Sequence, residues 1–219
     1  MLELVYTVGR SLPKPLRIKD IAIRMGFNTT DWVRVVMYQE CNAFIESIEP
    51  ETIDVLDISG GGVGGISQWR QRFKFGSYTS TSFPDFDICA EVVDRQFDLI
   101  IADQVFEHLA WPMRAGRNVY TMLRRGGYFV ITTPFLIRVH EDPIDCSRWT
   151  EQGLSYLLQE CGFPALDIKT GSWGNRKCLE ANLSKWHKYG FYRSLANEPN
   201  FPVMVWAIAR KAAETSEGR

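Results

Sequence analysis

Residues 53–65 read IDVLDISGGGVGG, and this stretch decides the fold class of the chain. Its first six residues are mostly apolar, which is typical of a short buried strand. Five glycines follow within the last six positions. Glycine permits unusual backbone angles and lets a ligand approach the main chain, and a helix predicted over residues 66–73 points its first amides at the same place. The stretch therefore predicts a strand, a ligand-binding turn and a helix.

Strands and helices alternate on both sides of this unit. The pattern of apolar and turn residues predicts helices over residues 32–48, 112–123 and 150–161, and strands over residues 76–80, 97–102, 128–133, 165–170 and 203–209. This alternation predicts an α/β fold with a mostly parallel sheet that helices cover on both faces. Ligands of such sheets bind at the carboxyl ends of the strands, so the residues that follow each strand are the candidates for a site.

The composition excludes several classes of protein. With 219 residues, 45% of them hydrophobic, the chain can build one domain with a sizeable core. Its 25 basic and 26 acidic residues leave no basic excess, so a dedicated nucleic-acid binder is not expected. The longest apolar run near either end covers only residues 203–209, whereas a membrane span needs about 20 residues. Residues 1–10 do not resemble a signal peptide.

The cysteines and histidines indicate a reducing compartment. Five cysteines without a C-x-x-C pair favour neither a disulfide scaffold nor a zinc ribbon, and with only three histidines no metal is expected. We therefore predict a soluble, cytoplasmic protein. Residues 1–30 are predicted as an N-terminal arm, residues 31–211 as the folded domain and residues 212–219 as a flexible tail.

Two cofactors compete for the glycine turn. A nicotinamide dinucleotide needs a cradle for its pyrophosphate and an acidic residue about 20 positions further on. Asp85 and Asp87 lie in that range. S-adenosylmethionine carries no phosphate; it needs an acidic residue at the strand end and glycines that allow a close approach to the main chain. Asp57, inside the strand just before the glycines, fits S-adenosylmethionine better.

Four segments in this order resemble the class I S-adenosylmethionine-dependent methyltransferases. They are VLDISGGGVGG (55–65), FDLIIADQVFEHL (97–109), MLRRGGYFVITTP (122–134) and RWTEQGLSYLLQECGF (148–163). The resemblance covers roughly residues 53–211 and points to the broad group with quinone-biosynthesis and bacterial small-molecule or glycan methyltransferases. It implies a Rossmann-like three-layer sandwich with a seven-stranded, mostly parallel sheet. The last strand, residues 203–209, would be antiparallel.

The resemblance also implies the residues that bind the cofactor. Asp57 matches the acid that orients the first turn and the amino group of the cofactor. The turn under the methionine part corresponds to Ser59, Gly60, Gly61 and Gly62. The turn after the fourth strand of the family, which flanks the methyl group, corresponds to Asp103, Gln104 and Val105. Glu107 and His108 match the E-H pair that opens the next helix.

The sequence departs from the family in two places. Ser59 and Val63 stand where the family has the first and third glycines of its turn. The second strand ends without the carboxylate that holds the ribose hydroxyls. The candidates for that role are Asp87, Asp85 and the hydroxyl of Ser82.

The reaction itself is an in-line displacement, in which the protein mainly aligns the reactants and a base takes the proton of the acceptor. His140, after the predicted strand 128–133, is the leading candidate for this base, and His108 is the second. Arg148 and Trp149 belong to an R-[aromatic]-T element that is predicted to contact the substrate. Residues 171–200 are predicted as a substrate-facing insertion, with Trp173 and Arg176 as contacts.

These observations predict a methyltransferase that acts on a small molecule or a glycan intermediate. A noncatalytic protein on the same fold is an alternative, because the ribose carboxylate is missing. A nicotinamide-dependent oxidoreductase is the other alternative. The sequence indicates neither the acceptor atom nor the oligomeric state.

Overall fold

The computed structural model describes residues 30–60, 67–141 and 143–213. Together these ranges contain six strands in a single sheet with the order β2-β1-β3-β4-β6-β5. The strands are β1 (Asp54–Asp57), β2 (Ser77–Ser80), β3 (Phe97–Asp103), β4 (Leu123–Pro134), β5 (Ile168–Trp173) and β6 (Met204–Arg210). The α-helices are α2 (Val35–Ser47), α3 (Gln68–Arg72), α4 (Pro112–Met122), α5 (Glu151–Glu160) and α6 (Arg176–Asn182). Short 3-10 turns include η1 (Trp32–Arg34), η2 (Pro50–Thr52), η3 (Phe106–His108) and η4 (Ala165–Asp167).

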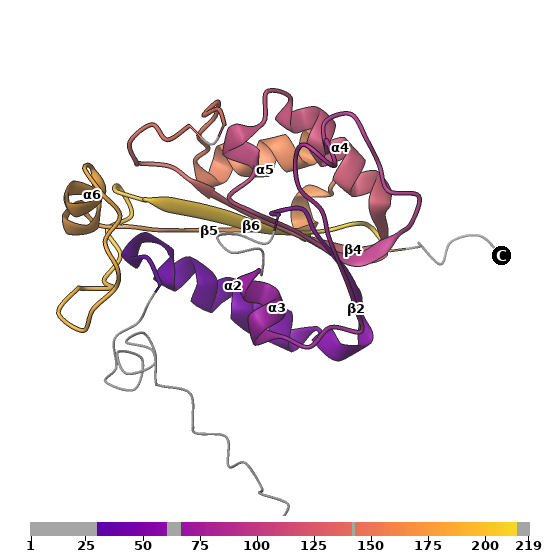
Figure 1. Ribbon diagram of the computed structural model, residues 1–219, viewed down its shortest axis with the longest axis horizontal. Coiled ribbons are helices and arrows are strands. Elements are labelled where there is room, and N and C mark those ends of the chain that lie inside the picture. Colours follow the sequence, from indigo (N-terminus) through magenta and orange to yellow (C-terminus); the bar gives the residue numbers. More distant parts are fainter. Residues whose placement is uncertain (1–29, 61–66, 142, 214–219) are drawn as a thin grey trace, which may run out of the picture.

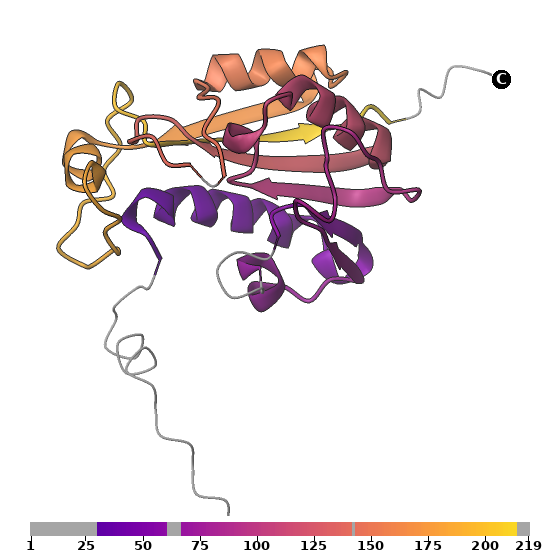
Figure 2. The ribbon, with the colours of Figure 1, turned by 45° about the horizontal axis from the view of Figure 1, so that its top comes forward.

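Three layers make up the domain, with α4 and α5 on one face of the sheet and α2 and α3 on the other (Figures 1 and 2). Strands β1 to β4 run parallel, and β6 is antiparallel to both β4 and β5. The predicted α/β class and the antiparallel last strand are therefore confirmed. In the described ranges, no helix has the length and apolar character needed to cross a membrane.

The two faces of β3 belong to two separate cores. Leu99 and Ile101 pack on the α2 side, whereas Ile100 and Ala102 pack on the α4 and α5 side. All four side chains are completely buried. Successive residues of a strand point to opposite faces, so this continuous apolar run fills both layers.

The prediction of seven strands is not confirmed in the described residues, which form six. The segment between β2 and β3, residues 81–96, contains turns in place of an outer edge strand. Pro84 has no backbone N–H to offer to a sheet, and the Asp87 carboxylate accepts a hydrogen bond from the Cys89 N–H at 2.9 Å, which closes a turn. These residues instead form a wall of the cavity described below.

Strand β4 begins earlier than predicted. Helix α4 ends at Met122, and Gly126 and Gly127 lie inside the strand. The register between β3 and β4 shifts between Phe97 and Leu99, which indicates a bulge. Gly126 adopts a φ of 77° in the extra stretch of β4. The predicted helix over residues 66–73 corresponds to the shorter α3.

A charge network at the amino end of the sheet gives a pH-dependent prediction. A hydrogen bond from Ser77 (2.5 Å) and then one from Arg124 (2.7 Å) lower the pKa of Asp54 from 3.8 to about 2. Because the folded-state pKa lies below the ordinary value, this stabilisation is present above pH 3.8 and is lost as the pH falls toward 2. We expect Ser77→Ala to lower the melting temperature at pH 6 and the difference from the native chain to shrink to zero by about pH 2. Thermal unfolding of both proteins across this range is the measurement; a difference that stays constant with pH would contradict the assignment.

Candidate active site

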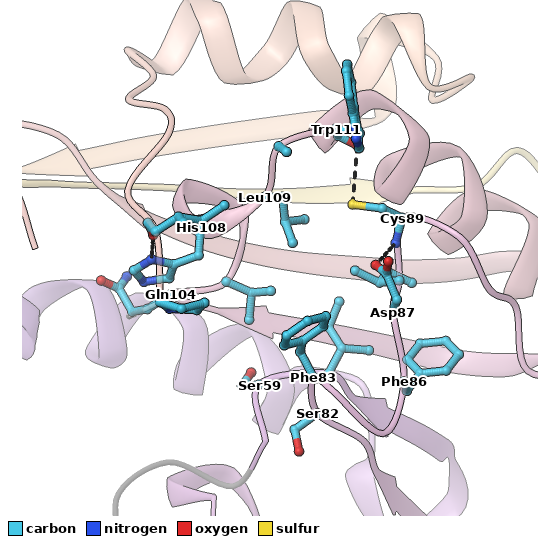
Figure 3. Close-up of a pocket in the computed structure, with 16 residues that line it drawn as sticks. Ser59, Ser82, Phe83, Phe86, Asp87, Cys89, Gln104, His108, Leu109 and Trp111 are labelled. Atoms are coloured by element: carbon cyan, nitrogen blue, oxygen red, sulfur yellow. Dashed lines mark hydrogen bonds between the residues drawn. The ribbon is translucent and has the colours of Figure 1, made fainter. Parts of the chain in front are cut away.

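A cavity of about 480 Å³ opens at the carboxyl ends of β1 and β3. Its volume lies in the range of sites for small ligands. Figure 3 shows the side chains that line it, which come from four segments of the chain. The lining residues are Ile58, Ser59, Ser82, Phe83, Phe86, Asp87, Ile88, Cys89, Gln104, Val105, His108, Leu109, Ala110, Trp111, Pro143 and Ile144. The cavity therefore lies where a parallel sheet is expected to bind its ligand.

Asp57 fixes the turn that follows β1. Its side chain is completely buried, and it accepts hydrogen bonds from the Ser59 N–H at 2.9 Å and from the Tyr78 hydroxyl at 2.5 Å. The Ser59 hydroxyl in turn accepts a hydrogen bond from the Asp103 N–H at 2.8 Å. Burial, and then the Asp57 charge, raises the pKa of Tyr78, so the phenol stays a donor. The ends of β1, β2 and β3 are thus tied together around one carboxylate.

Gly60, next to the cavity-lining Ser59, has to be glycine because it packs closely against Ser82. Its φ is 69°, and a Cβ on it would lie 2.7 Å from the Cβ of Ser82. A hydrogen bond from the Gly60 N–H to the Thr81 carbonyl (3.1 Å) holds the two turns together. Without a side chain at this position, the backbone and the Ser82 hydroxyl reach the cavity side by side. Gly61 and Gly62, also predicted to bind the cofactor, lie outside the described residues.

The cavity suits a nucleoside with a charged amino-acid tail. Its lining includes the polar residues Asp87 and Ser82 and the apolar residues Ile88 and Val105. A ribose needs hydroxyl or carboxylate partners, and a purine ring needs apolar walls. The predicted candidates Ser82 and Asp87 therefore both lie on the cavity that a cofactor would fill.

The turn after β3 places two of its three predicted residues on the cavity. Gln104 has a φ of 58°, which is rare for a residue with a side chain, and it lines the cavity with Val105. The Asp103 carboxylate points elsewhere: it accepts hydrogen bonds from Thr132 (2.7 Å), Tyr38 (3.0 Å) and Gln68 (3.3 Å). Asp103 thus braces the turn that presents Gln104.

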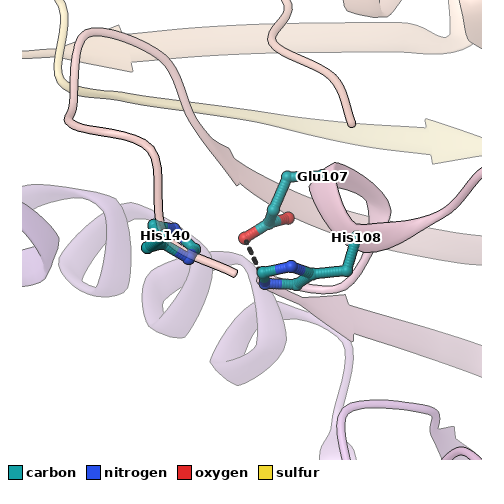
Figure 4. Close-up of side chains that lie close together, drawn as sticks. All are labelled: Glu107, His108 and His140. Atoms are coloured by element: carbon teal, nitrogen blue, oxygen red, sulfur yellow. Dashed lines mark ion pairs between the residues drawn. The ribbon is translucent and has the colours of Figure 1, made fainter. Parts of the chain in front are cut away.

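Three groups that bind protons or metals meet at one end of the cavity (Figure 4). Ligand atoms of Glu107, His108 and His140 all lie within 4.8 Å of one another. The Glu107 side chain is completely buried, and neither of its oxygens has a hydrogen-bond partner in the described residues. Burial raises the pKa of this carboxyl to about 8. Burial, and then the neighbouring His108, lowers the pKa of His140.

Each of the two histidines has a defined setting. His108 lies with its Nδ1 2.5 Å from the Ile144 carbonyl oxygen and its Nε2 3.7 Å from a Glu107 oxygen. The His140 ring lies between His108 and Trp186, with centroid distances of 5.1 and 6.0 Å. The two predicted bases are therefore neighbours, although 32 positions separate them in the sequence.

The loop that carries His140 is held by an ion pair. The His140 N–H donates to Asp145 at 2.8 Å, and both terminal nitrogens of Arg148 donate to the same carboxylate. Arg148, predicted to bind substrate, is thus engaged in positioning the loop. Trp149 is partly buried and packs against the core beneath α5.

The two other predicted substrate contacts lie away from the cavity. Trp173 is only 2% exposed, and its indole N–H donates to the Leu195 carbonyl at 2.9 Å. Arg176 is exposed and pairs with Glu198 at 2.9 Å. Neither residue lines the cavity, so the structure gives them roles in packing and in a surface ion pair.

Sequence reasoning did not single out Tyr78, Tyr38 or the chemical importance of Glu107. The two tyrosines matter because their hydroxyls reach acidic residues on neighbouring strands. Tyr78 lies two residues before the end of β2 and pairs with Val55 of β1. Its place near the end of a strand next to β1 could have indicated a contact with Asp57. Nothing in the sequence shows that the Glu107 oxygens have no hydrogen-bond partner among the residues that the structure describes.

Comparison with known proteins identifies one family model that matches part of the chain. Residues 56–131 match the family model described as a methyltransferase domain. No curated protein matches the chain. The matched segment runs from β1 through β4 and includes most residues of the cavity.

Several solved structures share the fold at low sequence identity. An S-adenosylmethionine-dependent methyltransferase from Mesorhizobium loti is 16% identical, with a TM-score of 0.51; the match covers 77% of this chain and 96% of that chain. One from Archaeoglobus fulgidus is 16% identical, with a TM-score of 0.50 and coverages of 79% and 94%. Phosphoethanolamine N-methyltransferase 2 of Haemonchus contortus, in complex with S-adenosylmethionine, is 13% identical, with a TM-score of 0.51 and coverages of 80% and 53%.

These likenesses show the fold, and the family match adds the methyltransferase domain itself. Neither the oxidoreductase nor the noncatalytic alternative is favoured by any of these matches. A segment that matches a methyltransferase domain is thus folded around a cavity that suits the cofactor, and the chain shares the fold of the S-adenosylmethionine-dependent methyltransferases.

Proposed function

We propose that the chain transfers a methyl group from S-adenosylmethionine to a small-molecule or glycan-intermediate acceptor by in-line displacement. One observation carries this proposal: a cavity of about 480 Å³ extends from the turn after β1 to His108 after β3, whose ring centroid lies 5.1 Å from that of His140. A cavity of this size suits small ligands. The acceptor, or the part of it that reacts, is therefore small.

The cofactor end of the cavity is proposed to be the end near β1. There the backbone of Ser59 and Gly60 would hold the methionine part, with Asp57 as the brace beneath it. Ser82 and Asp87 would bind the ribose hydroxyls. When bound, the cofactor supplies a methyl group on a positively charged sulfur, and the protein supplies alignment, which contributes roughly 7–11 kcal/mol in well-oriented reactions.

The acceptor end is proposed to be the end near His108, where Trp111, Pro143 and Ile144 also line the cavity. An oxygen or nitrogen acceptor has a proton that must leave during or before transfer. We assign the handling of this proton to His108 and His140, the two imidazoles at that end. The aromatic and apolar lining suits a ring-shaped acceptor with few charges.

Calorimetric titration of the full chain tests the proposal. We expect S-adenosylmethionine and its demethylated product to bind with a micromolar Kd, which corresponds to about −8 kcal/mol, and NADH not to bind. A screen of small hydroxylated and aminated acceptors should then reveal release of the demethylated product. Cofactor binding without turnover on any acceptor would favour the noncatalytic alternative, and binding of NADH alone would contradict the proposal.

A further inference from the structure

We infer that Glu107, His108 and His140 form a binding site for one divalent transition-metal ion at the acceptor end of the cavity. The site itself stands on the geometry of these residues; its role in handling the acceptor rests on the proposed function. It also departs from the expectation of no metal that the sequence supports.

The positions of the three side chains are compatible with a shared ion. They come from two segments of the chain: η3 after β3 carries Glu107 and His108, and the loop after β4 carries His140 (Figure 4). Their ligand atoms lie within 4.8 Å of one another. Atoms bound about 2.1 Å from one ion lie at most about 4.2 Å apart, so small side-chain rotations bring all three into range.

Glu107 is the residue that most requires a cation. A buried carboxylate without hydrogen bonds is costly, and such groups in proteins are normally paired or bound to a metal. Two arginines, Arg34 and Arg148, lie within electrostatic reach, but neither is hydrogen-bonded to it. Arg148 is engaged with Asp145. The nearest cationic group is His108 at 3.7 Å, which pairs with the carboxylate only when it is protonated.

One of the two histidines, His108, is oriented as metal ligands usually are. The Ile144 carbonyl accepts a hydrogen bond, so His108 Nδ1 carries the proton and the lone pair of Nε2 faces Glu107. A backbone carbonyl on the second ring nitrogen is a common support for a ligating histidine. Asp145 fixes the backbone of His140 from the other side.

The donor set indicates the class of ion. Two imidazoles and one carboxylate suit Zn²⁺, Fe²⁺, Co²⁺ or Mn²⁺ better than Ca²⁺ or Mg²⁺, which prefer oxygen ligands throughout. Three protein ligands also leave positions for other groups, as in catalytic sites. Since His108 and Ile144 line the cavity, the open positions would face an acceptor. An ion there would polarise the acceptor oxygen or nitrogen and ease loss of its proton. This role would replace direct proton transfer to the two imidazoles, because their lone pairs would then bind the ion.

Metal titration of the full chain tests this inference. After removal of metal with a chelator, we expect Co²⁺ to bind at one equivalent, with a visible absorption spectrum, and Zn²⁺ to displace it. His140→Ala and Glu107→Gln should each weaken binding roughly 100-fold, because each removes one of three protein ligands. His187→Gln removes the histidine outside the cluster and Cys146→Ser removes a nearby exposed thiol, and both should bind like the native chain.

The outcomes separate this inference from the proposed function. Absence of stoichiometric binding, or equal binding by His140→Ala, would overturn the metal site; His140 is partly exposed, so this variant tests the site even if Glu107→Gln fails to fold. Calorimetry with S-adenosylmethionine on the same samples reports on the cofactor site alone. Metal binding without cofactor binding would leave the site standing and remove the proposed reaction.

Discussion

Replacing Asp57 by Ala is expected to weaken binding of S-adenosylmethionine roughly 100-fold or more. The carboxylate is the common acceptor for the Ser59 N–H and the Tyr78 hydroxyl, so its removal leaves both donors unpaired. A hydrogen bond to a charged group contributes about 1.5–3 kcal/mol, and about 2.8 kcal/mol corresponds to a factor of 100. The loss should appear in the Kd measured by calorimetry, with circular dichroism confirming that the chain is folded.

Two further variants identify how Asp57 acts. Asp57→Asn keeps the shape and an acceptor for Ser59 but removes the charge, so it isolates the electrostatic part. Tyr78→Phe keeps the carboxylate and removes one donor, and it should weaken binding less than tenfold. Unchanged cofactor affinity in a folded Asp57→Ala chain would show that the cofactor site has been placed wrongly.

Replacing Gly174 by Ala is expected to destabilise the fold by about 3 kcal/mol or more. An added Cβ would lie 2.1 Å from the Phe201 carbonyl oxygen and 2.5 Å from the Val203 nitrogen. These are backbone atoms, which cannot rotate away as a side chain does. The segment they belong to would have to move. This movement would disturb the hydrogen bond of 2.8 Å from the Val203 N–H to the Trp173 carbonyl, next to the start of β6. For a chain of this size we expect the melting temperature to fall by roughly 6–12 °C.

Gly153→Ala is the matched control for this experiment. Gly153 lies in α5, where the nearest atom to an added Cβ is the Thr150 hydroxyl at 3.4 Å, an ordinary contact. Alanine is the better helix former by about 0.8–1 kcal/mol, so this variant should be neutral or more stable. Equal melting temperatures for the two variants would contradict the close contact at Gly174.

Much of the fold was predictable because local signals coincide with tertiary structure. Thr150 caps α5 through the Gly153 N–H, at the position that the sequence indicated. The strands β3 and β6 are buried on both faces of the sheet, and their sequences are correspondingly apolar along most of their length. The seventh strand came from resemblance alone and is not confirmed in the described residues, where the segment after β2 contains Pro84 and the Asp87 turn. The early start of β4 depends on a bulge with Gly126 at positive φ, which no periodicity reveals.

The candidate site was predictable to the extent that the topology determines it. Ser59, Ser82, Gln104 and Val105 follow three strands of one parallel sheet, and they meet in the cavity as that arrangement requires. Trp173 was predicted to contact the substrate as part of a substrate-facing insertion, yet it is 2% exposed and does not line the cavity. The closeness of His108 and His140 depends on the path of a loop, and sequence spacing carries no information about it.

The division of β3 between two cores limits how the length of this chain can change. Deleting or inserting one residue within Phe97–Asp103 would turn Leu99 and Ile101 to the opposite layer and exchange both interiors at once. The same shift would turn Gln104 away from the cavity, since this residue follows the strand directly. Insertions and deletions in related chains are therefore expected in the connections around the sheet. The length and register of this central strand are expected to stay constant.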